Sequence, residues 1–287
     1  LHEFAPNAQI IHIDIDTASI SRNIQVDIPI VADAKDALAK MSEYVSDYAS
    51  KKWNSEINSW KQEHPLVMRP NDRLSPVDII NQINCQFEEA IIVTDVRQHQ
   101  MLVSQYAEIT PGKQLVMSGG LGTMGYGFPG GVGAKIGNPD KPVIVISGDG
   151  GMQMNIQEFA TAVLEELPLI LCVFNNEYLG MVRQWQKLFY GKRYSMTNLR
   201  SGALSRRTNG EEYPKYTPDF VKLAESYGAQ GIRVFKKEEI IPAFEKAKAK
   251  TDGPTIIEFI IENEELVMPM VKPNGSITDL IMERGEE

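Results

Sequence analysis

The run VIVISGDG at residues 143–150, followed after a helix-length segment by LILCVFNN at 169–176, is the clearest structural signal in this chain. Both runs are short and apolar, and both end in small polar residues. Similar runs occur at 90–96 (AIIVTDV) and 254–261 (PTIIEFII). Apolar strands separated by helices are typical of a parallel sheet that is covered on both faces. We therefore predict an α/β fold, a doubly wound parallel sheet with helices on both faces.

Polar side chains follow the ends of two of these predicted strands, namely Asp149 and Asn176. In open α/β sheets, ligands bind outside the carboxyl ends of the strands. Mg²⁺ takes one or two carboxylates together with phosphates, carbonyls and water. Apolar residues recur at helical spacing in 152–167, so we also predict a helix whose N-terminus faces an anion. The pattern indicates a site for Mg²⁺ and a phosphorylated cofactor.

The distance from GDG (148–150) to NN (175–176) resembles the cofactor signature of thiamin diphosphate enzymes. Four further strings are TDVRQHQM (94–101), SGGLGTMGYGFP (118–129), NNEYLGMVRQWQKLFY (175–190) and VMPMV (267–271). Together they resemble the C-terminal portion of the catalytic large subunit of acetolactate synthase (acetohydroxyacid synthase), over nearly the whole chain. Pyruvate oxidase and glyoxylate carboligase share the GDG-to-NN part but are not expected to share all the other strings.

The resemblance implies a thiamin diphosphate-dependent and Mg²⁺-dependent transferase. Its reaction would be decarboxylation of pyruvate and transfer of the hydroxyethyl unit to a second 2-oxo acid, pyruvate or 2-oxobutyrate. That reaction belongs to branched-chain amino acid biosynthesis, leading to valine and isoleucine. Two alternatives stay open. One is another thiamin diphosphate enzyme, such as pyruvate oxidase or a carboligase, and the other is a non-catalytic binding or assembly module of the same fold.

The resemblance also implies which residues hold the diphosphate end of the cofactor. The metal ligands are Asp149, Asn176 and the main-chain carbonyl of Tyr178. The diphosphate-binding residues are Val96, Arg97, Gln98, His99, Gly150 and Gly151. The family usually has glycine where Arg97 stands. Two interpretations of Arg97 stay open: its guanidinium pairs with a phosphate, or it points to solvent above a strained turn.

The catalytic pocket is implied by the same resemblance. Met124 matches the bulky residue that bends the cofactor by packing between its two rings, and Gly122 lets the backbone approach the pyrimidine. Gly180 and Met181 would flank the thiazolium. Trp185 follows Met181 by one helical turn and would shape the pocket for the second 2-oxo acid, or serve as a buried interface residue. The activating glutamate, expected from a neighbouring subunit, is not in this chain, so we expect no turnover by the chain alone.

The chain is expected to contain three parts. Residues 1–40, with the β-rich runs IIHIDID and IPIVAD, resemble the C-terminal tail of a central, FAD-associated domain. Residues 41–74 are predicted to be a helical connector and linker, and residues 75–287 the cofactor domain. Ser75 and Pro76 are suited to begin its first helix. The chain begins at Leu1 without a methionine, and we interpret it as part of a longer protein.

The resemblance places four residues of the N-terminal part near the adenosine of a structural FAD. They are Asp14, Ile15, Asp33 and Ala34. A carboxylate at a strand end often holds a ribose hydroxyl. Simple capping of the strand ends is an equal alternative.

The amino-acid composition limits the classes of partner that the protein is expected to bind. The net charge of −9 argues against nucleic acid or an anionic membrane as a partner, and no apolar run is long enough to span a membrane. Cys85 and Cys172 lie in a predicted buried helix and a predicted buried strand, which indicates core thiols and a cytoplasmic location. The polar stretch 199–218 is predicted to be a mobile loop. The resemblance implies a homodimer or dimer of dimers and a possible regulatory small subunit.

Overall fold

The computed structural model describes residues 4–46, 50–66, 73–199, 218–262 and 265–282. The chain divides into two compact units. Unit 1 comprises residues 1–67 and 274–279, and unit 2 comprises residues 68–273 and 280–287. Except for the four residues predicted to lie near FAD, all the predicted site residues belong to unit 2.

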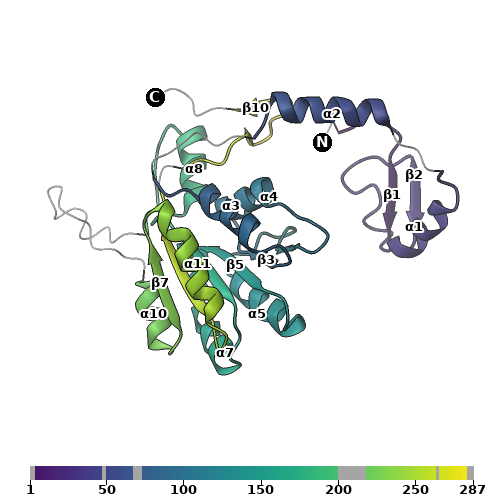
Figure 1. Ribbon diagram of the computed structural model, residues 1–287. Helices are drawn as coiled ribbons and strands as arrows, with labels where there is room; N and C mark the ends of the chain where they lie inside the picture. Colours follow the sequence, from purple (N-terminus) through teal and green to yellow (C-terminus); the bar gives the residue numbers. More distant parts are fainter. Residues whose placement is uncertain (1–3, 47–49, 67–72, 200–217, 263–264, 283–287) are drawn as a thin grey trace. The chain divides into compact units, whose positions relative to one another are not determined.

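The core of unit 2 is a six-stranded parallel sheet with the order β4-β3-β5-β6-β8-β7. Figure 1 labels β3, β5 and β7 of this sheet. Its strands are β3 (Ile91–Thr94), β4 (Gln114–Met117), β5 (Val143–Gly148), β6 (Ile170–Asn175), β7 (Gln230–Val234) and β8 (Thr255–Ile260). Strand β3 pairs with β4 on one side and with β5 on the other, so the winding direction reverses there. A ligand crevice is expected at that reversal. The predicted doubly wound parallel sheet is confirmed.

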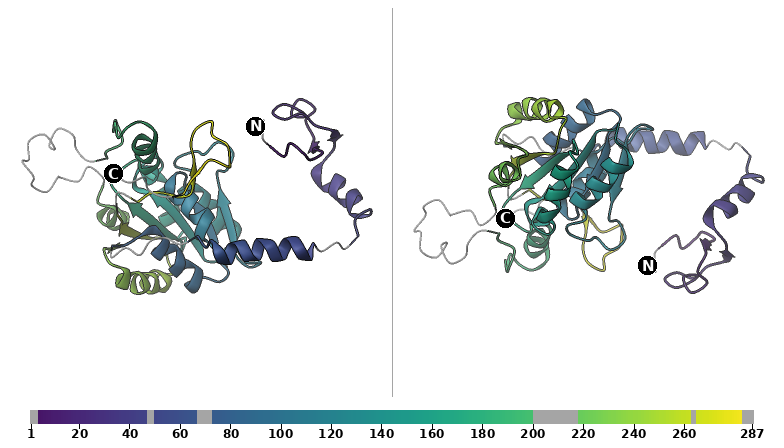
Figure 2. Two further views of the ribbon diagram at one scale, coloured as in Figure 1. Left: turned by 90° about the horizontal axis from the view of Figure 1, so that it is seen from above. Right: turned by 90° about the horizontal axis from the view of Figure 1, so that it is seen from below.

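The apolar strands supply alternate side chains to two cores, one on each face. Val145 faces one core and Ile146 faces the other, as the two-residue period of a strand requires. One face is covered by α3 (Pro76–Gln86), α4 (Gln98–Tyr106) and α11 (Ile240–Ala249). The other is covered by α5 (Gly127–Gly137), α7 (Phe159–Leu164) and α10 (Phe220–Ser226), and Figure 2 shows the layers from two sides.

The four strands predicted from the sequence, β3, β5, β6 and β8, are the four inner strands of the sheet. The two edge strands, β4 and β7, were not predicted. Their sequences, QLVM and QGIRV, are short and contain polar residues, and most of their side chains are only partly buried. An edge strand does not need the continuous apolar run by which an inner strand is recognised.

The helix predicted at 152–167 is wrong as a single element. The chain forms the short α6 (Asp149–Met152), a 3₁₀ turn η1 (Ile156–Glu158) and then α7. Asn155 interrupts the helix with φ −135°, and its Nδ2 donates to the carbonyl oxygen of Gly125 at 2.8 Å. A side-chain bond of this kind competes with the helical backbone pattern. The predicted helix is therefore divided at Asn155, and its first part, α6, begins at Asp149.

Helix α3 begins where the sequence predicts. Ser75 Oγ accepts from the N–H of Asp78 at 3.2 Å, and Asp78 Oδ2 accepts from the N–H of Ser75 at 3.0 Å, which together form a capping box. The predicted helical segment MVRQWQ lies in α8 (Gly180–Phe189). Unit 2 also contains the 3₁₀ turn η2 (Lys237–Glu239) and the antiparallel pair β9 (Met270–Val271) and β10 (Leu280–Ile281).

Unit 1 consists of two parallel strands and two helices. The strands are β1 (Ile11–Asp14) and β2 (Ile28–Val31), and the helices are α1 (Ala34–Ser42) and α2 (Lys51–Glu63). Among its described residues, Ala37 is the only apolar side chain classed as buried. The described residues of unit 1 therefore form almost no apolar core. The predicted boundaries at 40/41 and 74/75 stay predictions.

The two cysteines differ in environment. Cys172 lies inside β6, where burial raises the pKa of its thiol, so the predicted core thiol is confirmed there. The prediction for Cys85 is wrong, because this residue is exposed near the end of α3. The buried side of that helix carries Val77, Ile80 and Ile83 instead. Residues 200–217, most of the predicted loop, lie outside the described residues.

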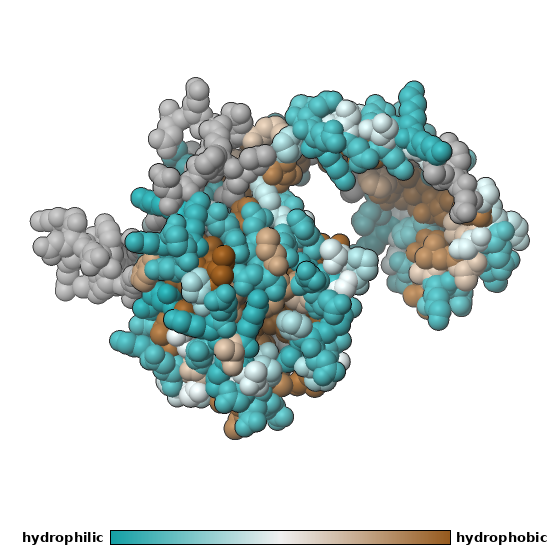
Figure 3. All heavy atoms as spheres, in the orientation of Figure 1, coloured by the Kyte–Doolittle hydropathy of each residue, from teal (hydrophilic) through white to brown (hydrophobic). Residues whose placement is uncertain are grey.

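The outer surface of unit 2 is mainly hydrophilic on the face that Figure 3 presents, in keeping with the acidic composition. Within the described ranges, none of the helices combines the length and the apolarity that a membrane span needs.

Candidate functional site

One pocket lies at the carboxyl ends of β3, β5 and β6, where ligands bind in open α/β sheets. It contains twelve of the predicted residues: Val96, Arg97, Gln98, His99, Met124, Asp149, Gly150, Gly151, Asn176, Tyr178, Gly180 and Met181. Segments far apart in the sequence therefore meet at one place. We call this the strand-end pocket.

Asp149 is the buried carboxylate of the strand-end pocket, with only 2% of the residue exposed. Its Oδ1 accepts from the N–H of Gly150 at 2.9 Å, whereas its Oδ2 is buried without a hydrogen-bond partner. Burial is the main cause that raises the pKa of Asp149 to about 7. A buried carboxylate oxygen without a partner is costly, and a bound cation would offset that cost.

The other two predicted metal ligands come from the turn after β6. Asn176 Oδ1 accepts from the N–H of Tyr178 at 3.1 Å, which orients the amide. Asn175 stabilises this turn through two hydrogen bonds. Its Nδ2 donates to Glu258 Oε1 at 2.7 Å, and its Oδ1 accepts from the N–H of Glu177 at 3.1 Å. One carboxylate, one amide oxygen and one carbonyl fit the oxygen preference of Mg²⁺.

No group of three or more His, Cys, Asp or Glu side chains suited to a metal occurs among the described residues. The predicted ligand set contains a single carboxylate, so it does not form such a group. Its metal-binding role stays a prediction.

His99 lines the same pocket and is also buried. Burial is the main cause that lowers the pKa of His99 to about 4, so the imidazole is neutral at pH 7. The ring is hydrogen-bonded to the backbone of Asp95, while Nε2 is buried without a partner. The strand-end pocket thus holds two unsatisfied groups, a carboxylate oxygen and an imidazole nitrogen. A bound cation would satisfy the carboxylate oxygen. An anion beside His99 would satisfy its ring if the imidazole took up a proton, because Nε2 would then be a donor, and the two together fit a metal–diphosphate pair.

Gln98 uses its side-chain donor within the protein. Its Nε2 donates to Gln184 Oε1 at 2.8 Å and to the carbonyl oxygen of Glu265 at 3.1 Å. A Cβ atom on Gly180 would lie 1.9 Å from Gln98 Oε1, so α8 approaches Gln98 more closely than any side chain at position 180 allows. The predicted contact of Gln98 with a phosphate stays a prediction.

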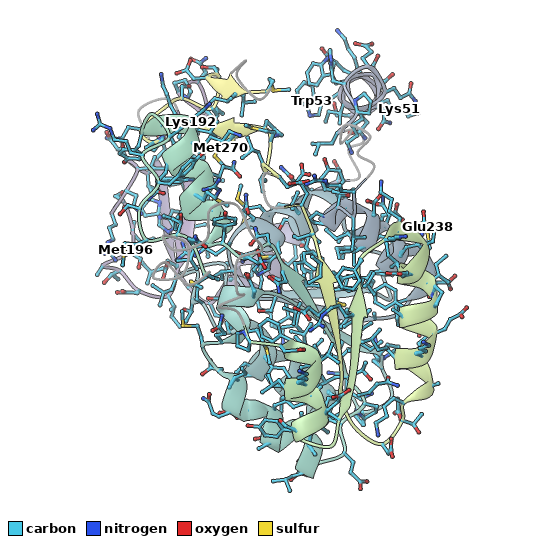
Figure 4. The ribbon with its side chains drawn as sticks, turned by 90° about the vertical axis from the view of Figure 1, so that its left-hand side faces the viewer. Lys51, Trp53, Lys192, Met196, Glu238 and Met270 are labelled. Atoms are coloured by element: carbon cyan, nitrogen blue, oxygen red, sulfur yellow. The ribbon has the colours of Figure 1, made fainter. Side chains whose placement is uncertain are left out.

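Gln184 is a residue of the site that sequence reasoning missed. It is 1% exposed on α8, its Oε1 accepts from the N–H of Val267 at 2.9 Å, and its Nε2 donates to the carbonyl oxygen of Val267 at 2.9 Å. The same Nε2 contacts the Sδ atom of Met270, labelled in Figure 4, at 3.4 Å. The three strings QHQM, MVRQWQ and VMPMV therefore meet at one pair of amides. A polar residue on the buried side of an amphipathic helix was the signal available in the sequence.

Asp95 was also missed. It is buried directly after β3, and its carboxylate accepts from the N–H groups of Val96 at 2.7 Å, Gly125 at 2.9 Å and Gly127 at 3.0 Å. It therefore joins the end of β3 to the glycine-rich turn that carries Met124. A Cβ atom on Gly127 would lie 2.6 Å from the nitrogen of Asp95, which explains a glycine there. The acidic residue after an apolar strand was the sequence signal.

A second pocket adjoins α8 and contains Arg97, Met181, Val182, Trp185, Gln186, Tyr190 and Arg193. We call it the helix pocket. Met181 and Trp185 both line it, so they share one side of α8, and Met181 and Arg97 also line the strand-end pocket. Trp185 is 40% exposed and packs edge-on against Phe189. Its role toward a second substrate stays a prediction.

The remaining predicted residues lie elsewhere. Gly122 has φ +64°, a left-handed conformation that favours glycine, and it is not among the residues lining the strand-end pocket. In unit 1, Asp14 Oδ1 accepts from the N–H of Asp16 at 2.8 Å, and Asp33 Oδ1 caps α1 by accepting from the N–H of Lys35 at 2.8 Å. Ile15 is exposed and Ala34 is the first residue of α1. The capping interpretation therefore applies to both carboxylates, and their role toward FAD stays a prediction.

A doubly wound sheet with a polar pocket at its winding reversal defines an α/β protein that binds a ligand at the carboxyl ends of its strands. Residues 95–259 match the family model described as thiamine pyrophosphate enzyme, C-terminal TPP binding domain, and residues 1–41 match the model for the central domain of thiamine pyrophosphate enzymes. The chain therefore belongs to the thiamine pyrophosphate enzyme family.

Within that family, the chain is similar to acetolactate synthase large subunits, as its motifs predict. It is 42% identical to the subunit of Corynebacterium glutamicum over 287 residues, which cover 96% of this chain and 44% of the relative. It is 39% identical to that of Cyanidium caldarium (98% and 47% covered) and 34% identical to that of Haemophilus influenzae (100% and 49% covered). The chain spans about half the length of the curated relatives it matches.

Proposed function

We propose that this chain is the diphosphate-binding part of an acetolactate synthase. The complete protein would condense two pyruvates to 2-acetolactate, or pyruvate with 2-oxobutyrate to the homologous product, in valine and isoleucine biosynthesis. The observation that carries the proposal is the strand-end pocket, where Asp149 Oδ2 and His99 Nε2 lie buried without partners. The similarity to acetolactate synthase large subunits supports the assignment of this condensation reaction.

The protein's part in this reaction is to bind and orient the cofactor. Thiamin diphosphate, when bound, supplies the nucleophilic carbon that attacks a 2-oxo acid and the electron sink for decarboxylation. Asp149, Asn176 and the carbonyl of Tyr178 would hold Mg²⁺, and the N–H groups of Gly150 and Gly151 would face the phosphates. Magnesium would also keep Asp149 ionised, because it opposes the burial that raises the pKa of this carboxyl.

The remaining residues of the pocket control position and water access. Met124 would pack under the cofactor, and Asp95 holds the turn that carries it. Gln98 and Gln184 hold α8 and the 265–270 segment beside the pocket. These contacts keep the apolar side chains of Met181 and Leu179 at the pocket wall, where they exclude water from the diphosphate end.

We extend the proposal to the parts of the protein that the family resemblance implies. Asp14, Ile15, Asp33 and Ala34 would lie near a structural FAD. The complete protein would be a cytoplasmic homodimer or dimer of dimers, with a possible regulatory small subunit. The glutamate that activates the cofactor would come from a neighbouring subunit.

The test is calorimetric titration of thiamin diphosphate and Mg²⁺ into the complete polypeptide that carries this sequence. We expect Asp149→Ala to abolish binding and the matched exposed variant Asp252→Ala to bind as the wild type does. A product assay follows, in which the wild type is expected to form 2-acetolactate from pyruvate. Acetate or peroxide as the only product would replace this proposal with an oxidase of the same family, and failure of the wild type to bind the cofactor would indicate an assembly module.

A further inference from the structure

Arg97 has a backbone conformation that side chains rarely adopt. Its φ of 104° and ψ of −149° lie in a region that is essentially restricted to glycine. The surrounding contacts leave the turn little freedom, because Val96 N–H is bound to Asp95 and the carbonyl oxygen of Arg97 accepts from the N–H of Met101 at the start of α4. A strained side chain at a pocket is a reason to look for a function of that side chain.

Arg97 lines both the strand-end pocket and the helix pocket. Its Nη2 is 3.5 Å from Met124 Sδ, a weak acceptor. Among the residues that the structure describes, no carboxylate forms an ion pair with Arg97. The residue is exposed at the edge of both pockets, and its positive charge has no charged partner among the described residues.

The helix pocket has the character of a site for a small organic anion. Met181, Val182 and Trp185 give it apolar walls, and Arg193 brings a second guanidinium. A planar guanidinium binds a carboxylate through two parallel hydrogen bonds. Resting on the function proposed above, we propose that Arg97 binds the carboxylate of a 2-oxo acid substrate, so that it is a specificity-determining residue of the reaction.

The alternative target of Arg97 is a phosphate of the cofactor. Asp149, Asn176 and Tyr178, the predicted metal ligands, line the strand-end pocket and not the helix pocket. Arg97 contacts Met124, which lines the strand-end pocket, and it shares the helix pocket with Trp185. Trp185 and the second guanidinium, Arg193, line only the helix pocket, and this combination of an aromatic wall and two cations favours the substrate carboxylate over the diphosphate.

Three substitutions in the complete polypeptide distinguish the effect of the positive charge of Arg97 from the effect of its strained backbone. Arg97→Gln removes the charge and keeps a side chain, Arg97→Lys keeps the charge, and Arg97→Gly removes both the charge and the strain. With saturating thiamin diphosphate and Mg²⁺, we expect the KM for pyruvate to rise about tenfold or more in Arg97→Gln and Arg97→Gly, and less in Arg97→Lys. The Kd of thiamin diphosphate, measured by calorimetry, should stay within about twofold. Only Arg97→Gly should raise the Tm.

Lys246→Gln, an equal charge change on the exposed side of α11, is the matched control and should leave the KM and the Kd unchanged. An unchanged KM in Arg97→Gln would overturn the proposal. A tenfold weaker Kd for the cofactor with an unchanged KM would also overturn it and assign Arg97 to the diphosphate. If the wild type consumes pyruvate without forming acetolactate, yet its KM still depends on Arg97, the proposed reaction fails and the carboxylate contact stands.

Discussion

Asp149 gives the metal-free protein an unusual dependence on pH. Its folded pKa of about 7 lies above the ordinary value of 3.8, so the folded state holds its proton more tightly than the unfolded state does. The stability gained from this proton is complete below about pH 4 and is lost as the pH rises toward 7. Burial of the charged form thus opposes folding at neutral pH.

The first prediction is that Asp149→Asn stabilises the metal-free protein, and by more at pH 8 than at pH 5. The difference between the two gains is expected to be about 3 kcal/mol, since a pKa unit corresponds to about 1.4 kcal/mol. Urea denaturation in the presence of a chelator measures it. An equal effect of the substitution at both pH values would contradict the pKa assigned to Asp149.

His99 changes the stability with pH in the direction opposite to that of Asp149. Its pKa is lowered from 6.5 to about 4, so the unfolded state takes up a proton more readily, and the stability present above pH 6.5 is lost as the pH falls toward 4. The second prediction is that His99→Gln removes this loss. Relative to the wild type, the variant should gain about 2 kcal/mol between pH 7.5 and pH 5, measured by urea denaturation.

The control for this experiment is His64→Gln, which removes an exposed histidine at the end of α2 in unit 1, outside the sheet of unit 2. It should leave the pH dependence as it is in the wild type. A variant at position 99 that remained as sensitive to acid as the wild type would show that His99 is not buried in its neutral form.

At the scale of the element, helix α5 illustrates how closely a helix packs on the sheet. A Cβ atom on Gly131 would lie 2.2 Å from Val145 Cγ2 of β5, whereas a Cβ atom on Gly133 would have nothing within 4 Å. The third prediction is that Gly131→Ala destabilises the protein by about 1–3 kcal/mol through overpacking. Gly133→Ala should instead stabilise it by up to about 1 kcal/mol, because alanine favours a helix. Thermal or urea denaturation distinguishes the two, and equal effects would contradict the close contact.

Much of the fold could be predicted at this scale because inner strands and amphipathic helices leave strong patterns. The runs that became β5 and β6 contain the continuous apolar segments VIVI and ILCVF, and α3 has a capping box at its start. The edge strand β7 is partly exposed and lacks such a pattern. The break at Asn155 depends on a bond to Gly125, thirty residues away, which no local pattern contains.

The residues of the candidate site likewise include some that a local sequence pattern predicts and others that depend on distant contacts. Asp149 and Asn176 were predictable because they follow apolar strands. The function of Gln184 depends on Val267, which lies 83 residues further along the chain. The exposure of Cys85 also depends on which side of α3 faces the sheet, and the apolar residues around it left that side ambiguous.

At the scale of the whole molecule, the two units differ in internal support. Unit 2 has two cores, one on each face of its sheet, whereas among the described residues of unit 1 only Ala37 is a buried apolar side chain. A unit with so little buried apolar surface contributes little stability of its own. The denaturation experiments above therefore report on unit 2.

The fourth prediction concerns activity, since the chain spans about half the length of its curated relatives. We expect the isolated chain to form no measurable acetolactate from pyruvate, Mg²⁺ and thiamin diphosphate, because the function proposed above takes the activating glutamate from outside it. The complete polypeptide, assayed in parallel for acetolactate, is the positive control. Rapid product formation by the isolated chain would show that it contains every catalytic group.

The amide pair of Gln98 and Gln184 has a consequence for the conditions under which the site keeps its shape. Both side chains are uncharged at every pH at which the protein is folded, and their bonds to each other and to Val267 involve no ion pair. Neither protonation nor added salt weakens such bonds directly. Asp149 and His99 change their charge with pH. The hydrogen bonds of Gln98 and Gln184, in contrast, do not depend directly on pH or on salt concentration. Activity lost at acid pH or high salt should therefore return as soon as the solution is restored.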